Sequence, residues 1–303
     1  MKKIIALSLV LVLAVFCFAA CTKETPANTE KTYTLALAVD TTIADDNKVT
    51  NYVTALVLDE NNKIVAVRID CIETTPELEN GAIKDVVSVA SKVAQGENYG
   101  GATSYAPMKS GSFAKQTAAF EAAIVGKSAD EVANLDLSLV AGCTMPYSPV
   151  SFKAVIAKAF ASDNKTTFKT SESFTLGLAA DMSVSGGKVT TYYTGIAVVG
   201  GKLAASIIDC GEVSFTVDGD AIIAGEYNGT KVELGENYGG ATSYAPMKSG
   251  SFAKQTAAFE DAIVGKTADE VASLDLSLVA GCTMPYSPIS FKVVLAQAFT
   301  NAR

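Results

Sequence analysis

The stretch GENYGGATSYAPMKSGSFAKQTAAF runs from Gly96 to Phe120 and occurs again, letter for letter, from Gly235 to Phe259. The duplication continues to residues 161 and 300, and the two copies differ at only eight positions. The offset is 139 residues (235 − 96), which indicates whole domains in series rather than a solenoid of short repeats. The segments before each copy are related but more diverged. We therefore predict two tandem homologous domains, residues 33–162 and 168–303, with a polar joint at 162–170.

Each domain has the pattern of an α+β fold. Residues 33–43 alternate in polarity, and the apolar runs 53–58 and 63–69 flank a hairpin turn signal, Asp59-Glu-Asn-Asn62. Helices are expected in the second half of each domain, from the apolar spacing of 112–125 and from the Ser-Pro dipeptide at Ser148. Capping boxes at Ser128 and Thr267 open a short helix in each copy. Each domain should be a small antiparallel sheet packed with two to three helices.

The first residues of the chain are typical of a targeting segment. Lys2 and Lys3 precede an apolar run from Ile4 to Phe18, and Phe18-Ala-Ala-Cys21 resembles the cleavage site of bacterial lipoprotein signal peptidase. An uncleaved transmembrane anchor is the alternative, although the run is short for a membrane span. We predict a signal peptide at 1–20, a lipidated Cys21, and a flexible tether at 21–32. The mature protein is then expected on the extracytoplasmic face of the cell membrane, held by its lipid anchor.

Composition excludes several classes of function. The chain has no histidine and a formal net charge of −8. Without histidine there is no Ser-His-Asp or Cys-His nucleophile pair and no histidine-ligated metal, so we assign no catalytic and no metal-binding residues. The acidic balance argues against nucleic acid as a partner.

Cysteines occur at equivalent positions in the two domains. Cys71 and Cys143 in the first domain match Cys210 and Cys282 in the second. Outside the cytosol this pattern favours the disulfides Cys71–Cys143 and Cys210–Cys282. Buried free thiols and a redox-active pair are the alternatives, the latter without any C-x-x-C motif.

Three segments of each domain together resemble the FMN-binding domain family, which includes the flavin-carrying subunits of bacterial redox complexes. The hairpin YVTALVLDENNKIVAVRI resembles the strand–turn–strand of that family, Glu73-Thr-Thr-Pro76 its "ETPG" segment, and LVAGCTMPYSPVSFKAVI from Leu139 its "SGAT.TS.AV" ending. The resemblance covers about 100 residues of each domain, and it extends to uncharacterised lipoproteins of Firmicute type. It implies this fold and a flavin cofactor.

The attachment motif of that family is altered here. FMN is joined there to a threonine hydroxyl, whereas the matching positions in this chain are Pro146 and Pro285, which have no hydroxyl group. A non-covalent FMN site is compatible with the same loops, where backbone N–H groups near the helix start would meet a phosphate and tyrosines would stack on the ring. The candidate cofactor-binding residues are Gly142, Thr144, Tyr147, Gly281, Thr283 and Tyr286.

Two functions follow as hypotheses. The first is a non-catalytic lipoprotein that uses its repeated loops to bind a small molecule or a surface protein partner. The second is an FMN-binding electron carrier for redox transfer outside the membrane. Because the attachment hydroxyl is missing twice, we favour the first.

Overall fold

The computed structural model describes residues 29–101, 109–145, 148–240, 247–284 and 287–303. The predicted signal peptide and Cys21 lie outside the described residues. The described chain is an α+β protein with antiparallel sheets, as predicted.

The first sheet has the strand order β3-β2-β1-β7. Its strands are β1 (Lys31–Ile43), β2 (Val49–Leu58), β3 (Ile64–Thr74) and β7 (Lys165–Thr170). The hairpin predicted around residues 59–62 is confirmed, and Asn62 adopts a positive φ of 55° in that turn. The predicted polar joint supplies β7, which pairs with β1 from Lys31↔Thr170 to Ala36↔Lys165.

The second sheet has the order β11-β10-β9-β8-β6. Its strands are β6 (Val86–Val89), β8 (Phe174–Ser185), β9 (Lys188–Val199), β10 (Lys202–Asp218) and β11 (Ala221–Thr230). The short strand β6 comes from the first repeat, between the β4–β5 ribbon (Leu78–Glu79 and Ala82–Ile83) and the helices. It pairs with β8 of the second repeat, so the first repeat supplies an edge strand to the sheet of the second.

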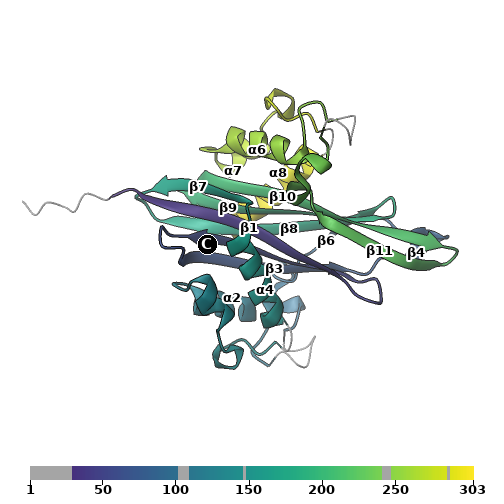
Figure 1. The fold of residues 1–303 in the computed structure, drawn as a ribbon, viewed down its shortest axis with the longest axis horizontal. Coiled ribbons are helices and arrows are strands. Elements are labelled where there is room, and N and C mark those ends of the chain that lie inside the picture. Colours follow the sequence, from purple (N-terminus) through teal and green to yellow (C-terminus); the bar gives the residue numbers. More distant parts are fainter. Residues whose placement is uncertain (1–28, 102–108, 146–147, 241–246, 285–286) are drawn as a thin grey trace, which may run out of the picture.

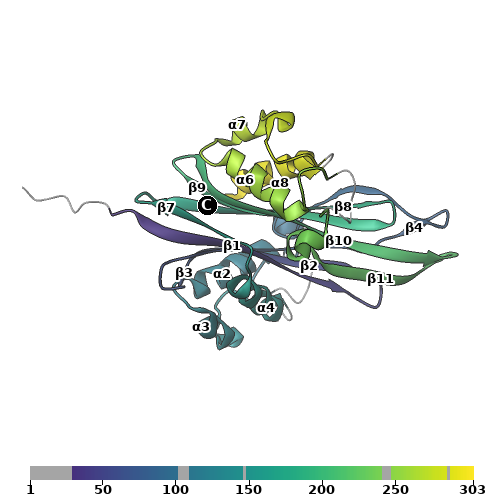
Figure 2. The same cartoon turned by 45° about the horizontal axis from the view of Figure 1, so that its top comes forward.

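The two sheets face each other, and helices cover their outer faces (Figures 1 and 2). One outer layer contains α2 (Phe113–Ile124), α3 (Ala129–Ala133) and α4 (Ser148–Ala161). The other contains α6 (Phe252–Ile263), α7 (Ala268–Ala272) and α8 (Ser287–Asn301), and the four-residue α5 (Lys231–Leu234) precedes it. The predicted helices and both capping boxes are confirmed.

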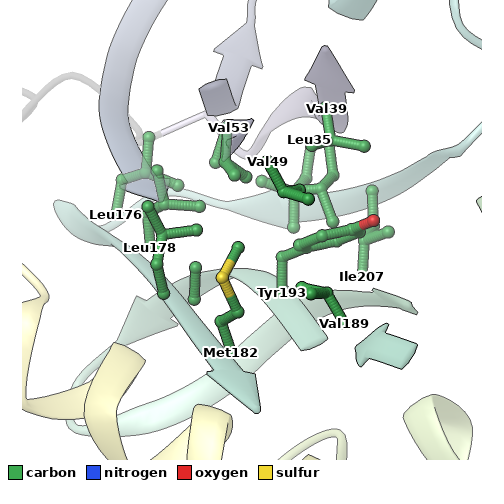
Figure 3. Packing of buried hydrophobic residues seen from close by; sticks show 14 of the residues in the cluster. Leu35, Val39, Val49, Val53, Leu176, Leu178, Met182, Val189, Tyr193 and Ile207 are labelled. Carbon is green, nitrogen blue, oxygen red and sulfur yellow. The ribbon is translucent and has the colours of Figure 1, made fainter. Parts of the chain in front are cut away.

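Three apolar cores result from this layering. Each sheet packs against its own helices in an outer core, around Phe120 and Phe152 in the first repeat and around Phe259 and Phe291 in the second. The third core lies between the sheets and contains side chains of both repeats (Figure 3). Strand β1 contributes to two of them, because Leu35 and Val39 enter the core between the sheets while Ala36 lies in the outer core.

The approach of the two sheets is close. A Cβ atom on Gly195 of β9 would lie 2.9 Å from the Cβ atom of Ala55 on β2, so only glycine fits that contact. The repeats therefore share a core, a feature that the tandem-domain prediction did not include.

Candidate functional site

A buried lysine lies at the same place in each repeat. The ammonium of Lys92, which follows β6, is 2.9 Å from a carboxylate oxygen of Glu73 at the end of β3. In the second repeat, Lys231 at the start of α5 is 2.8 Å from Glu212 on β10. The lysine side chains are only 8% and 7% exposed, and those of their glutamate partners 23% and 22%. Each repeat thus holds an enclosed ion pair.

Aromatic rings complete the surroundings of each lysine. Lys92 Nζ lies 4.7 Å from the ring centroid of Tyr99 and 5.6 Å from that of Phe113, at cation–π distance. The Tyr99 hydroxyl donates a hydrogen bond of 3.1 Å to Glu73. We call this group of four residues the lysine cluster. Its members in the second repeat are Lys231, Glu212, Tyr238 and Phe252, with ring distances of 4.5 and 5.5 Å.

A buried aspartate holds the lysine segment against the sheet. Asp70 on β3 accepts hydrogen bonds from the backbone N–H groups of Cys71 (2.7 Å) and Val93 (3.0 Å) and from the Ser91 hydroxyl (2.6 Å). Asp209 does the same for Cys210 and Val232 in the second repeat. Burial raises the pKa of Asp70 to about 6 and that of Asp209 to about 7, against the opposing effect of these donors.

The lysine in each cluster stays charged. Burial alone would lower the pKa of Lys92, but the neighbouring Cys71, Tyr99 and Glu73 raise it above its usual value. The same balance, with Cys210 and Glu212, raises the pKa of Lys231. Neither amine is available as a base or nucleophile near neutral pH.

The described cysteines are free, buried thiols, and the predicted disulfides Cys71–Cys143 and Cys210–Cys282 are not formed in this structure. Cys71 instead has its thiol beside the Lys92 ammonium. Burial raises the pKa of Cys71 and of Cys210 to about 12, which keeps both protonated. The alternative of buried free thiols fits this arrangement.

A chain of aromatic contacts leads from the lysine cluster to the start of α4. The rings of Phe113 and Phe152 are 5.8 Å apart, and those of Phe152 and Tyr52 are 5.9 Å apart. The Tyr52 hydroxyl lies 3.3 Å from the hydroxyl of Ser148, the first residue of α4. The first residues of α4 thus share one aromatic network with the lysine cluster.

Of the predicted cofactor-binding residues, Gly142 and Thr144 lie on the exposed loop that precedes α4. The Thr144 hydroxyl accepts a hydrogen bond from the Ser110 N–H (3.1 Å) and donates one to Gln116 Oε1 (3.3 Å). Gly281 and Thr283 are arranged in the same way against α6. These loops are held by α2 and α6 rather than by the lysine cluster. Tyr147 and Tyr286 lie outside the described residues.

The sequence contained a signal for the lysine cluster that its motifs did not reveal. Between residues 70–93 and 209–232 only seven aligned pairs are identical. They are Asp70/Asp209, Cys71/Cys210, Glu73/Glu212, Ala82/Ala221, Ile83/Ile222, Lys92/Lys231 and Val93/Val232. Among them are the lysine and glutamate of each cluster and the aspartate and cysteine beside them, so comparing the diverged halves of the repeats identifies the site.

No group of three or more potential metal-ligating side chains occurs among the described residues. Within the same residues, no helix has the length and apolar character needed to cross a membrane. Comparisons with protein-family models, with curated proteins and with solved structures found no match to this chain.

Proposed function

We propose that this protein is a lipid-anchored extracytoplasmic lipoprotein that binds a ligand or protein partner without catalysis, through one site in each repeat. The observation that carries the proposal is the lysine cluster. Its lysine and glutamate are kept in both copies of a segment in which most other positions have diverged. They are also kept although the strand before each lysine pairs differently, β6 with β8 but β11 with β10.

Folding alone does not require that both repeats keep this lysine–glutamate ion pair. A buried ion pair adds little net stability, because desolvating two charges offsets their attraction. An apolar pair of similar volume would fill the same space against Tyr99 and Phe113. Two identical polar clusters, each beside a copy of the same loop sequence, are instead what a duplicated binding site requires.

The chemistry of the cluster favours binding over catalysis. Its lysine stays protonated, and so does the cysteine beside it. Asp70 and Asp209 have raised pKa values, but each is only 4% exposed and is enclosed by backbone donors, so a substrate does not reach them. The lysine is enclosed as well, so what the cluster presents to a ligand is the partly exposed carboxylate and tyrosine ring, which the buried ammonium holds in place.

A flavin role is the second candidate, supported by the family resemblance and by Tyr52 next to the first turn of α4. Covalent attachment does not fit the loops. Pro146 and Pro285 have no hydroxyl, and the hydroxyl of Thr144 is used within the loop. This candidate therefore requires non-covalent FMN.

The lipid anchor has its own test. We expect the protein from a host membrane fraction to begin at Cys21 and to carry the mass of its acyl chains, and we expect Cys21→Ala to abolish both the acyl mass and this N-terminus. Release of the unchanged protein by high salt alone would contradict the anchor.

Native mass spectrometry of protein isolated from its own envelope tests the binding sites. We expect a bound, non-covalent mass at up to one copy per repeat. Tyr99→Ala should remove one copy, Tyr238→Ala the other, and the paired change both. A bound mass that survives the paired change, or no bound mass at all, would contradict the proposal. FMN absorbance in that material, or a thermal shift when FMN is added to residues 22–303, would establish the flavin candidate instead.

A further inference from the structure

A cavity of about 660 Å³ lies on the second repeat, between the end of α4 and helix α6. Its walls include Asp163 and Asn164 after α4, Ile208 of β10, and Glu233 and Glu260 of the second-repeat helices. Its volume is in the range of small-molecule sites. None of its lining residues belongs to the lysine cluster or to the loops before α4 and α8, although Val232 and Ala253 directly follow the cluster residues Lys231 and Phe252.

The cavity contains a carboxylate without a cation. Glu260 accepts one hydrogen bond of 2.6 Å from the Ile208 N–H. Among the described residues, no lysine or arginine forms an ion pair with it, and Lys158 on the same wall is paired with Glu233 at 3.0 Å. The pKa of Glu260 is raised to about 8, by burial first and then by the charges of Asp209 and Asp261.

The first repeat shows what such a carboxylate binds. Glu121, the equivalent of Glu260, accepts the same backbone hydrogen bond, from Ile69 at 2.8 Å. Its Oε2 atom is 3.4 Å from the guanidinium of Arg68 and 3.3 Å from that of Arg303, the last residue of the chain. Two guanidinium groups of the protein itself therefore neutralise Glu121.

The second repeat has lost both partners. By the 139-residue offset, Arg68 corresponds to Ile207 and Arg303 to Asn164. The Asn164 amide donates to Asp209 instead (3.3 Å). The near-identical copies also differ at Ala122 and Asp261, and this change adds a negative charge next to Glu260. The cavity thus has the same acceptor as the first repeat and one more negative charge beside it, but neither of the guanidinium groups that pair with Glu121.

We propose that this cavity binds a small molecule bearing a guanidinium group, which takes the place that Arg68 and Arg303 occupy around Glu121. A guanidinium can donate two parallel hydrogen bonds to the two oxygens of a carboxylate, and it remains charged at all physiological pH values. The site occurs once per chain, so it is independent of the two sites proposed above. Glu260 is its anchor.

Calorimetric titration of residues 22–303 with agmatine is the direct test. We expect one site per chain. Glu260→Gln should weaken binding at least tenfold, because it removes the anionic acceptor. Asn164→Arg should weaken binding at least tenfold, because it places a guanidinium of the protein itself in the cavity wall, where the first repeat has Arg303. Asp269→Asn, an equal charge change at an exposed position of α7, is the matched control and should bind as the original chain does.

The pH dependence gives a second readout. Binding needs the charged carboxylate of Glu260, so affinity should rise from pH 6.5 to pH 8.5 with release of a proton. The other charged groups lining the cavity are Asp163, Glu233, Lys158 and Lys165. Asp209 and Asp261 lie outside its lining and act on Glu260 by their charge. In Glu260→Gln the pH dependence should become much shallower, with the nearby Asp209 as the group still titrating near pH 7. An affinity for agmatine that is independent of pH would overturn the proposal.

The choice of ligand separates a small molecule from a protein segment. Agmatine is compared with butylurea, which has a similar shape and no charge, and with a blocked Gly-Arg-Gly tripeptide. The proposal expects binding of agmatine and none of butylurea. Equal binding of both compounds, or binding of the tripeptide alone, would contradict it.

Discussion

At the scale of single residues, the lysine cluster makes the sharpest prediction. Replacing Lys92 by methionine removes the closest cation of Glu73 and leaves its carboxylate with the Tyr99 hydroxyl and with Lys48 at 3.9 Å. We expect a loss of about 2–3 kcal/mol in the free energy of unfolding, measured in urea. Adding Glu73→Gln should recover part of that loss. Lys231→Met with Glu212→Gln is the matched pair in the second repeat. If the changes in unfolding free energy caused by Lys92→Met and Glu73→Gln simply add in the double variant, the two side chains do not interact.

The raised pKa of Glu260 predicts how stability varies with pH. Its usual value is 4.5 and its value in the fold is about 8. Between these values the folded state binds more protons than the unfolded state, so stability should fall as pH rises from 5 to 8. Asp70 and Asp209 act in the same direction below pH 7.

Glu260→Gln removes its share of this slope. The free energy of unfolding is measured in urea at intervals of one pH unit. In the variant it should fall less steeply with pH than in the original chain, by at most about 1.4 kcal/mol per pH unit. Parallel curves for variant and original chain would mean that Glu260 titrates normally.

Thiol titration checks the state of the cysteines. Residues 22–303, prepared under oxidising conditions and then denatured, should yield four reactive thiols, from Cys71, Cys143, Cys210 and Cys282. The native protein should react slowly, since all four are buried. Fewer than four thiols after denaturation would restore the predicted disulfides.

At the scale of elements, local signals predicted helices well because their causes are local. Ser112, Ser128 and Thr267 accept hydrogen bonds from the third helical N–H group, as their spacing to the following residues indicates. The partner with which each strand pairs was not predicted from such local signals. Residues 82–91 and 221–230 are aligned copies, yet one forms β5 and β6 and the other β11. The two segments share only Ala82/Ala221 and Ile83/Ile222, and their partners differ, since β11 forms a hairpin with β10 whereas β6 pairs with β8 of the other repeat. Aligning the copies therefore did not predict the strand partner.

Strand β6, which the first repeat contributes to the sheet of the second, should be the least stable strand of that sheet. Its register with β8 is anchored only at Val86↔Val184 and Val89↔Met182, and Val87 between them is 91% exposed. The aligned strand β11 pairs with β10 along its length. We expect amides of residues 84–91 to exchange with deuterium faster than those of residues 223–230. Equal rates would indicate that β6 is held by more than its ladder.

At the scale of the whole molecule, the sequence predicted two repeats but not how they pack. Residues 35–39 are all apolar, so β1 has apolar side chains on both faces, and the helices account for only one of those faces. Leu35, Leu37 and Val39 needed a second partner, and the other repeat supplies it. A pattern of burial on both faces does not say whether that partner lies in the same repeat, so the shared core was not predictable from it.

A shared core predicts that damage to one repeat weakens both. Leu35 on β1 and Leu176 on β8 are aligned residues of the two copies, and both are fully buried between the sheets (Figure 3). Leu35→Ala or Leu176→Ala should each cost about 3 kcal/mol, from lost burial and the cavity left behind.

Which helices become less stable distinguishes a single folding unit from two repeats that fold independently. Deuterium exchange in rising urea reports separately on α4 in the first repeat and α8 in the second. If the sheets fold as one unit, either substitution lowers the protection of both helices to the same extent. If each repeat folded alone, only the helix of the altered repeat would respond. Phe120→Ala, in the outer core of the first repeat, is the comparison. It should also lower protection in both helices, because unfolding the first repeat exposes the apolar face on which the second depends.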